Sequence, residues 1–69
     1  MMVTFKLLGD KIFCEDKKSV SVVDAQSMQQ IASINMPDEN TYLTAVYKDQ
    51  LSNTILMAFD NRKMIGYDA

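Results

Sequence analysis

Histidine is absent from this chain of 69 residues, which has one cysteine, one proline and two glycines. The single cysteine, Cys14, excludes a disulfide within the chain, and without histidine the ordinary zinc sites are excluded as well. The common serine and cysteine triads also need a histidine base beside the nucleophile. The two glycines, Gly9 and Gly66, do not form a phosphate-binding loop. We therefore expect no metal, no cofactor and no catalytic activity in this chain.

Long apolar runs and an excess of positive charge are missing too. Seven basic and nine acidic residues give a net charge of -2 and leave no broad electropositive surface, so direct nucleic-acid binding is not expected. No apolar run approaches the roughly 18 residues of a membrane span, and "MMVTFKLL" is too short for a signal peptide, so no membrane association is expected. The lone thiol suits a reducing compartment, which predicts a cytoplasmic or nuclear location.

The chain is also short. A domain of this size buries only about 60% of the surface that its unfolded chain exposes. Small domains are commonly supported by disulfides, metals or oligomerisation. Since the first two are excluded, we expect stability to come from close packing or from a second chain.

Six segments have the composition of β-strands, and polar turns separate them. Gly9 and Asp10 form a two-residue turn signal, which predicts a hairpin. "VSVVD", "TYLTAVY" and "TILMAF" are compact β-rich segments that suit a pleated surface. The predicted strands cover residues 3–8, 11–16, 19–24, 41–47, 54–59 and 63–68.

The stretch "DAQSMQQIASINMP", residues 24–37, fits two structures. As a helix over residues 25–35 it would have Asp24 as its N-cap and Pro37 as its stop, with apolar residues at spacings of three and four. As a turn followed by a strand over residues 28–35, its apolar and polar residues would alternate. The local pattern leaves both structures open.

An internal repeat bears on this choice. Residues 11–25, "KIFCEDKKSVSVVDA", align without a gap with residues 55–69, "ILMAFDNRKMIGYDA", so that Asp16 matches Asp60 and Asp24 matches Asp68. A strand, a charged turn, a second strand and a terminal aspartate recur in the same order, 44 residues apart. Repeats of about 40 to 45 residues are typical of four-stranded β-propeller blades.

The segment "KIFCEDKKSVSVVDAQSMQQIASINMP" resembles a β-propeller repeat of the YVTN or WD-repeat kind. It has a strand, a charged turn, a second strand ending in an apolar residue and aspartate, a small polar turn and a further strand. "MIGYDA" repeats the ending, so that Val23-Asp24 and Tyr67-Asp68 stand where WD repeats have Trp-Asp. The Gly-His pair of WD repeats is absent, so the hydrogen-bond network of that family is incomplete here.

This resemblance implies that residues 24–37 form a tight turn and a strand. We therefore predict an all-β fold of antiparallel four-stranded blades, about one and three-quarter in number. The chain would be a single unit, with a first blade over residues 1–37 and an incomplete second blade over residues 38–69. A small α+β domain with a helix over residues 25–35 is the alternative.

The blade topology predicts where charged turns meet. The turns at residues 16–18, 37–40 and 60–62 would emerge at the same end of the sheets. Opposite charges alternate in them, and a mixed-charge rim of this kind can orient a partner protein. The candidate binding residues are Lys17, Lys18, Asp38, Glu39, Asn61 and Arg62.

The acidic residues in and near these turns lack the spacing of a calcium loop. Glu15, Asp16 and Asp60 are interpreted as solvated turn residues, the two aspartates as acceptors for turn amides. Cys14 is interpreted as a small buried apolar residue.

The expected function is that of a non-catalytic protein-interaction scaffold, a fragment of a WD-repeat-like β-propeller. The expected partner is another protein, the remaining blades of a propeller, or a further copy of the chain, because the strand over residues 63–68 would have an unpaired edge. A fragment of a propeller enzyme and a small self-contained ligand-binding domain are the alternatives.

Overall fold

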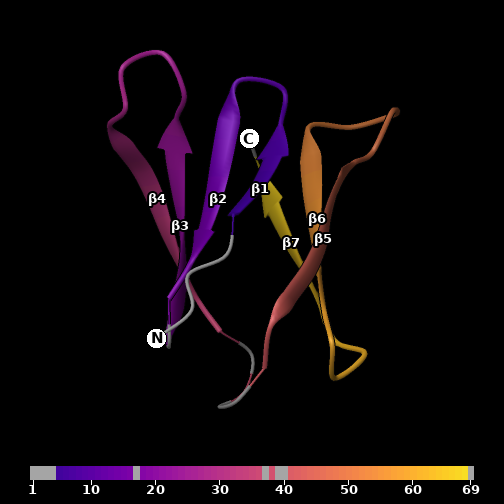
Figure 1. The fold of residues 1–69 in the computed structure, drawn as a ribbon. Helices are drawn as coiled ribbons and strands as arrows, with labels where there is room; N and C mark the ends of the chain where they lie inside the picture. The colour runs from indigo at the N-terminus through magenta and orange to yellow at the C-terminus, as the bar shows by residue number, and fades with distance from the viewer. Residues whose placement is uncertain (1–4, 17, 37, 39–40, 69) are drawn as a thin grey trace.

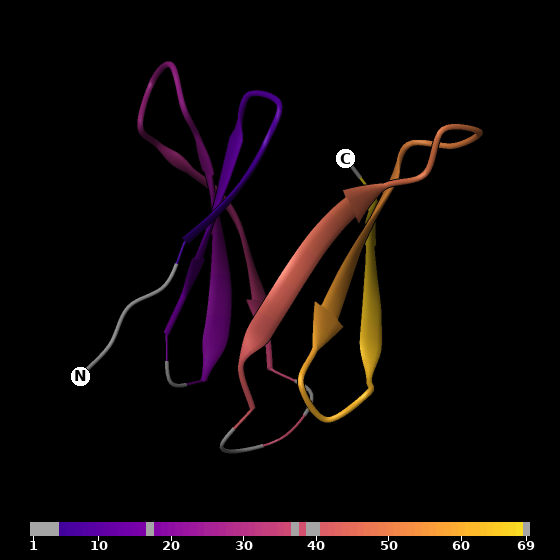
Figure 2. The ribbon, with the colours of Figure 1, turned by 45° about the vertical axis from the view of Figure 1, so that its right-hand side comes forward.

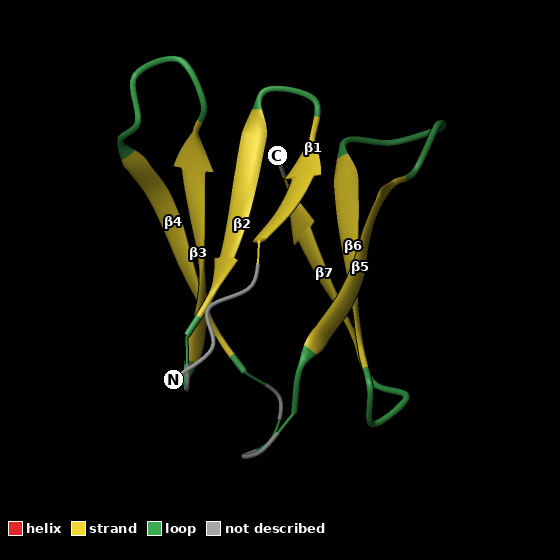
Figure 3. Ribbon diagram, viewed as in Figure 1, coloured by secondary structure: helices red, strands yellow, loops and turns green. Residues whose placement is uncertain are grey.

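The computed structural model describes residues 5–16, 18–36, 38 and 41–68. Over these residues the chain forms seven strands and no helix, which confirms the all-β prediction (Figures 1 and 3). The strands are β1 (Phe5–Leu8), β2 (Lys11–Glu15), β3 (Ser19–Asp24), β4 (Gln30–Asn35), β5 (Leu43–Lys48), β6 (Thr54–Phe59) and β7 (Met64–Asp68).

The strands form two antiparallel sheets in chain order. The first sheet has the order β1-β2-β3-β4 and the second sheet the order β5-β6-β7. The first strands of the two sheets, β1 and β5, contact each other and run in the same direction, and both sheets spread away from this contact (Figures 1 and 2). Each sheet therefore resembles a propeller blade.

The hairpin between β1 and β2 is the one predicted from Gly9 and Asp10. Leu8 pairs with Lys11, so the connection has two residues. Gly9 has a φ of 61°, a left-handed conformation that costs glycine little because it lacks a Cβ. Glycine at this position therefore fits the two-residue turn that the pairing of Leu8 with Lys11 requires.

Residues 25–35 do not form the alternative helix. The side chain of Asp24 accepts a hydrogen bond from the Gln26 amide at 2.8 Å, and its carbonyl oxygen accepts one from the Met28 amide at 2.7 Å. Met28 has a φ of 62°, outside the helical region. Strand β4 then begins at Gln30. The helix alternative is therefore wrong, because Asp24 closes a tight turn that an aspartate favours as readily as a helix start.

The core lies between the two sheets. Side chains alternate between the two faces of a strand, so every second side chain of each sheet points toward the other sheet. The seven apolar residues at the centre of this contact are at most 4% exposed. The first sheet contributes Phe13, Val20 and Val22, and the second contributes Leu43, Ile55, Met57 and Phe59. We call these two packed surfaces the inner faces.

The register corrects the gap-free alignment of the internal repeat. In the first sheet Glu15 pairs with Val20, whereas in the second sheet Ala58 pairs with Met64, so the second turn is one residue longer. If Val20 is matched with Met64, Phe13 then corresponds to Leu56 and not to Met57. A shift of one residue exchanges the faces of a strand, so this correction decides which side chains of the two sheets are equivalent.

Candidate protein-interaction surfaces

Three connections meet at one end of the molecule, as the blade topology predicts (Figure 1). They are the turn before β3, the connection from β4 to β5 and the turn before β7. The Met36 amide donates to the Lys18 carbonyl oxygen at 2.9 Å, and the Asp60 amide donates to the Tyr42 carbonyl oxygen at 3.0 Å. These two hydrogen bonds join the middle connection to both turns. We call this surface the loop end, with the described residues Lys18, Asp38, Asp60, Asn61, Arg62 and Lys63.

Asp38 is the centre of the polar contacts at the loop end. Its Oδ2 atom accepts a hydrogen bond from Asn61 Nδ2 at 2.7 Å and forms an ion pair with Lys63 Nζ at 2.7 Å. Thr41 Oγ1 donates to the Asp38 carbonyl oxygen at 2.9 Å. The structure thus brings together Asp38 and Asn61 from the predicted set. Lys63 was missed, although it follows Asn61 by two residues in the same turn.

The other predicted residues of the loop end do not join this cluster. Lys18 and Arg62 are exposed, and in the described part of the chain their side chains form no hydrogen bond or ion pair with Asp38. Arg62 has a φ of 72°, and its amide donates to the Phe59 carbonyl oxygen at 3.1 Å. Lys17 and Glu39 lie outside the described residues.

Glu15 is not the solvated turn residue that the sequence suggested. It occupies an inner-face position of β2, is 6% exposed, and accepts a hydrogen bond at Oε2 from the Leu43 amide at 2.6 Å. Asp60 Oδ1 accepts a hydrogen bond from the neighbouring Tyr42 amide at 3.0 Å. The carboxylates of Glu15 and Asp60 thus accept hydrogen bonds from two successive backbone amides at the start of β5. These bonds fix the backbone beside the loop end.

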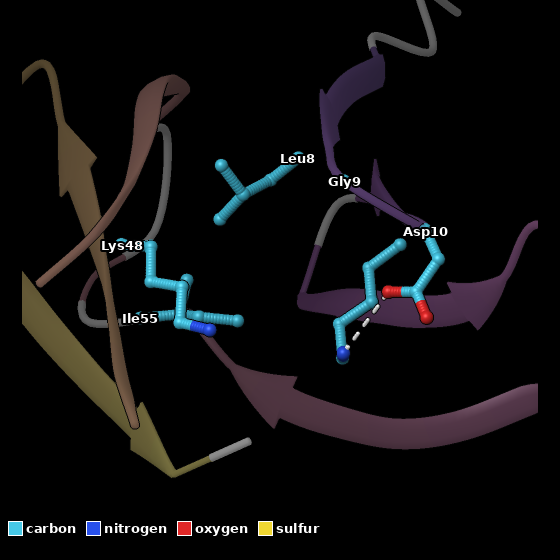
Figure 4. Close-up of a pocket in the computed structure, with 6 residues that line it drawn as sticks. Leu8, Gly9, Asp10, Lys48 and Ile55 are labelled. Atoms are coloured by element: carbon cyan, nitrogen blue, oxygen red, sulfur yellow. Dashed lines mark hydrogen bonds and ion pairs between the residues drawn. The ribbon is translucent and has the colours of Figure 1, made fainter. Parts of the chain in front are cut away.

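A small hollow lies at the opposite end, between the β1–β2 hairpin and the second sheet (Figure 4). It is lined by Leu8, Gly9, Asp10, Lys11, Lys48 and Ile55. Its volume is about 150 Å³, below the roughly 300 Å³ of the smallest ordinary ligand pockets. Lys11 Nζ lies 3.3 Å from Asp10 Oδ1, so those two charges are paired with each other. We assign no ligand to this hollow.

The outward surface of the first sheet is apolar over β1 and β2 and at Val23 of β3, while Ser19 and Ser21 of β3 lie on the same side. Phe5 and Leu7 are 59% and 74% exposed, and they pair across the ladder with half-buried side chains of β2. We call this surface the leading face, formed by Phe5, Leu7, Ile12, Cys14 and Val23. Cys14 is half-buried there and is not part of the closed core that the sequence suggested.

The outward surface of the second sheet is apolar except at one end, where Thr54 pairs with Asp68. Tyr47 pairs with Leu56 and Leu56 with Gly66, while Ala58 pairs with Ala45 on one side and with Met64 on the other. We call this surface the trailing face, formed by Ala45, Tyr47, Leu56, Ala58, Met64 and Gly66. An antiparallel sheet with one face in water normally alternates apolar and polar residues. Strand β6, "TILMAF", is apolar at five successive positions, which is typical of a sheet covered on both faces.

Each outward face occupies the same position in its sheet as the inner face of the other sheet. Because β1 and β5 run in the same direction and both sheets spread outward from them, a rotation that places the first sheet on the second puts the inner face of the first on the trailing face. The strand registers give the same correspondence, with Phe13 matched to Leu56 and Val20 to Met64. By the same rotation the leading face corresponds to the inner face of the second sheet, with Ile12 on Ile55 and Val23 on Tyr67.

The described residues contain no group of three or more cysteine and acidic side chains arranged to hold a metal ion. They also include no helix with the length and apolar character needed to cross a membrane. No family model, curated protein or solved structure matches this chain.

Proposed function

We propose that this chain is a non-catalytic unit of a WD-repeat-like β-propeller and serves as a protein-interaction scaffold. The observation that carries the proposal is the equivalence of the outward and inner faces. In a two-sheet sandwich whose outer faces meet solvent, those faces carry polar residues in alternation. Here the surface that packs the two sheets together recurs on the outside of both sheets, as it does for each blade of a propeller.

The loop end is the surface on which this unit would bind a partner protein. Its backbone is held by the carboxylates of Glu15 and Asp60, so its charged side chains are presented from a fixed base. Binding residues are commonly found on loops that a rigid scaffold positions. The paired Asp38 and Lys63 stand beside the exposed cation Arg62. Charges of both signs in a fixed arrangement would orient the partner more than they would add affinity.

Site-specific photo-cross-linking tests this proposal. A benzophenone amino acid is placed at Arg62, and at Ser52 in the exposed loop at the opposite end as the control. In cells that make the protein, we expect a discrete protein adduct from position 62 and none from position 52. Adducts of equal yield from both positions, or none from position 62, would contradict the proposal.

The binding assay then uses the purified partner and charge-swapped variants. Asp38→Lys and Lys63→Glu each break the ion pair, and the double variant restores it with reversed charges. If the partner recognises the charge pattern, all three variants bind at least about tenfold more weakly, a difference of about 1.4 kcal/mol. Full recovery of binding in the double variant would show that the pair is merely structural.

A further inference from the structure

We propose that the sheet covering each outward face belongs to a second copy of this chain, with the trailing face of one copy packed on the leading face of the next. This inference rests on the proposed function, because it identifies what completes the stack of blades. It assigns the exposed apolar side chains of both outer surfaces to one repeated interface.

The geometry of that interface is already present within one molecule. Leu56 and Met64 of the trailing face occupy the ladder positions that Phe13 and Val20 occupy on the inner face of the first sheet. Ile12 of the leading face occupies the position of Ile55 on the inner face of the second sheet. A trailing face placed on a leading face would therefore repeat the packing of the first sheet on the second. The new contact continues an interface that the molecule already contains.

The chemistry of the two faces suits such a contact. The residues that form the trailing and leading faces carry no charge. One charged residue, Asp68, lies on the same side of the second sheet at the end of β7, where it is exposed and accepts a hydrogen bond from Thr54 Oγ1 at 3.3 Å. Stacking that leaves this end of the sheet in water would bury no unpaired ion. Phe5 and Leu7 project from the leading face with more than half of their surface exposed.

The trailing face is recessed at Gly66, because glycine has no side chain. Among the described residues, a Cβ at this position would meet Thr54 Cγ2 at 3.4 Å and Leu56 Cδ2 at 4.0 Å, both from its own sheet. Gly66 is itself exposed. Glycine within a strand often marks close approach by another backbone or ligand, and here a projecting side chain of the leading face could enter that recess.

A second copy of this chain can supply the matching surface for either face. Each copy carries one trailing and one leading face, so the contact is head-to-tail and every bound copy offers the same face again. Such contacts close into a ring when the rotation between neighbours allows it. Propellers have typically four to eight blades, so about two to four copies that contribute two sheets each would complete one.

Sedimentation equilibrium across a concentration series is the first test. We expect the chain to form a closed assembly of about two to four copies at micromolar concentration, dissociating on dilution. A sharp monomer at every concentration up to the millimolar range would overturn the proposal.

Two single variants block one face each. Met64→Lys places a charge on the trailing face and Leu7→Lys places one on the leading face; both side chains are more than half exposed, so each monomer should fold. We expect each variant to weaken self-association by at least about a hundredfold, because each would bury an unpaired charge. Leu51→Lys is the matched control, since Leu51 is 96% exposed in the β5–β6 loop and belongs to neither face. Circular dichroism checks that all three variants remain folded.

Mixing the two blocked variants distinguishes head-to-tail stacking from a symmetric contact. Met64→Lys keeps its leading face and Leu7→Lys keeps its trailing face, so a mixture should form a one-to-one dimer that grows no further. If the trailing faces paired with each other, Leu7→Lys alone would still dimerise and mixing would add nothing. That result, or continued assembly of either variant alone at wild-type strength, would overturn the proposal.

Failure of the second-copy proposal can be distinguished from failure of the proposed function. Charge swaps at Asp38 and Lys63 lie at the loop end and should leave self-association unchanged. A monomeric chain that still cross-links its partner from position 62 would sink the second-copy proposal and leave the scaffold proposal standing. An assembled chain without a loop-end partner would do the reverse.

Discussion

The amide of Leu43, the first residue of β5, donates a 2.6 Å hydrogen bond to Oε2 of Glu15, the last residue of β2. The bond joins the two sheets across 28 positions of sequence, and Glu15 is 6% exposed. Hydrogen bonds to charged groups stabilise proteins more than neutral ones do, and a buried amide left without its acceptor is costly. We therefore regard this contact as the polar link that sets where the second sheet begins.

Replacing Glu15 by alanine should lower the free energy of unfolding by about 2 kcal/mol, because the Leu43 amide loses its acceptor inside the protein. Glu15→Gln keeps an acceptor oxygen and should lose about half as much. Urea unfolding at one fixed protein concentration measures both, since self-association would otherwise contribute. Equal midpoints for the alanine variant and the wild type would contradict the structural role of this contact.

Met28 tests the turn that replaced the helix alternative. Its φ of 62° is costly for a branched side chain and is tolerated by asparagine. We expect Met28→Ile to lower the free energy of unfolding by about 1–2 kcal/mol and Met28→Asn to leave it unchanged or raise it slightly. Thermal melts followed by circular dichroism compare the two. Asparagine and isoleucine variants of equal stability would argue against the left-handed turn.

The register of β7 can be tested with two adjacent residues. Ile65 packs against the core, whereas Met64 lies on the trailing face and is 61% exposed. In dilute solution, Ile65→Lys should lower the free energy of unfolding by roughly 2 kcal/mol or more, because it places an ammonium group between the sheets. Met64→Lys should leave the monomer nearly as stable as the wild type. The opposite order of stability would indicate that β7 pairs with β6 in the other register.

The Asp38–Lys63 ion pair should matter little for stability. Its side chains are 47% and 56% exposed, and exposed pairs contribute at most about 1 kcal/mol. We expect Asp38→Asn to change the free energy of unfolding by less than that amount, and the difference to shrink further in high salt. Melting curves at two ionic strengths check this. A large, salt-independent loss would assign Asp38 a structural role instead of a place on a binding surface.

Local chemistry in the sequence determined most of the strand pattern. Gly9 predicts the first hairpin because glycine accepts a positive φ, and the β-branched run "VSVVD" predicts β3. Strand bounds shifted by one or two residues, as for the second sheet, where β5 begins at Leu43 and β7 at Met64. The repeat of 44 residues predicted two successive sheets in chain order. These features depend on neighbours along the chain, so the order of residues is enough to reveal them.

Tertiary structure alone decided what each side chain faces. Asp24 suits a helix start and a turn equally well, and the turn prevails because β4 then pairs with β3. Glu15 has the composition of a turn residue, yet it is buried because its acceptor atom meets Leu43 of the other sheet. The extra residue in the β6–β7 turn exchanged the faces in the repeat alignment. Such contacts depend on the packing of sheets that are distant in sequence, and a period of two residues is the same whichever face is buried.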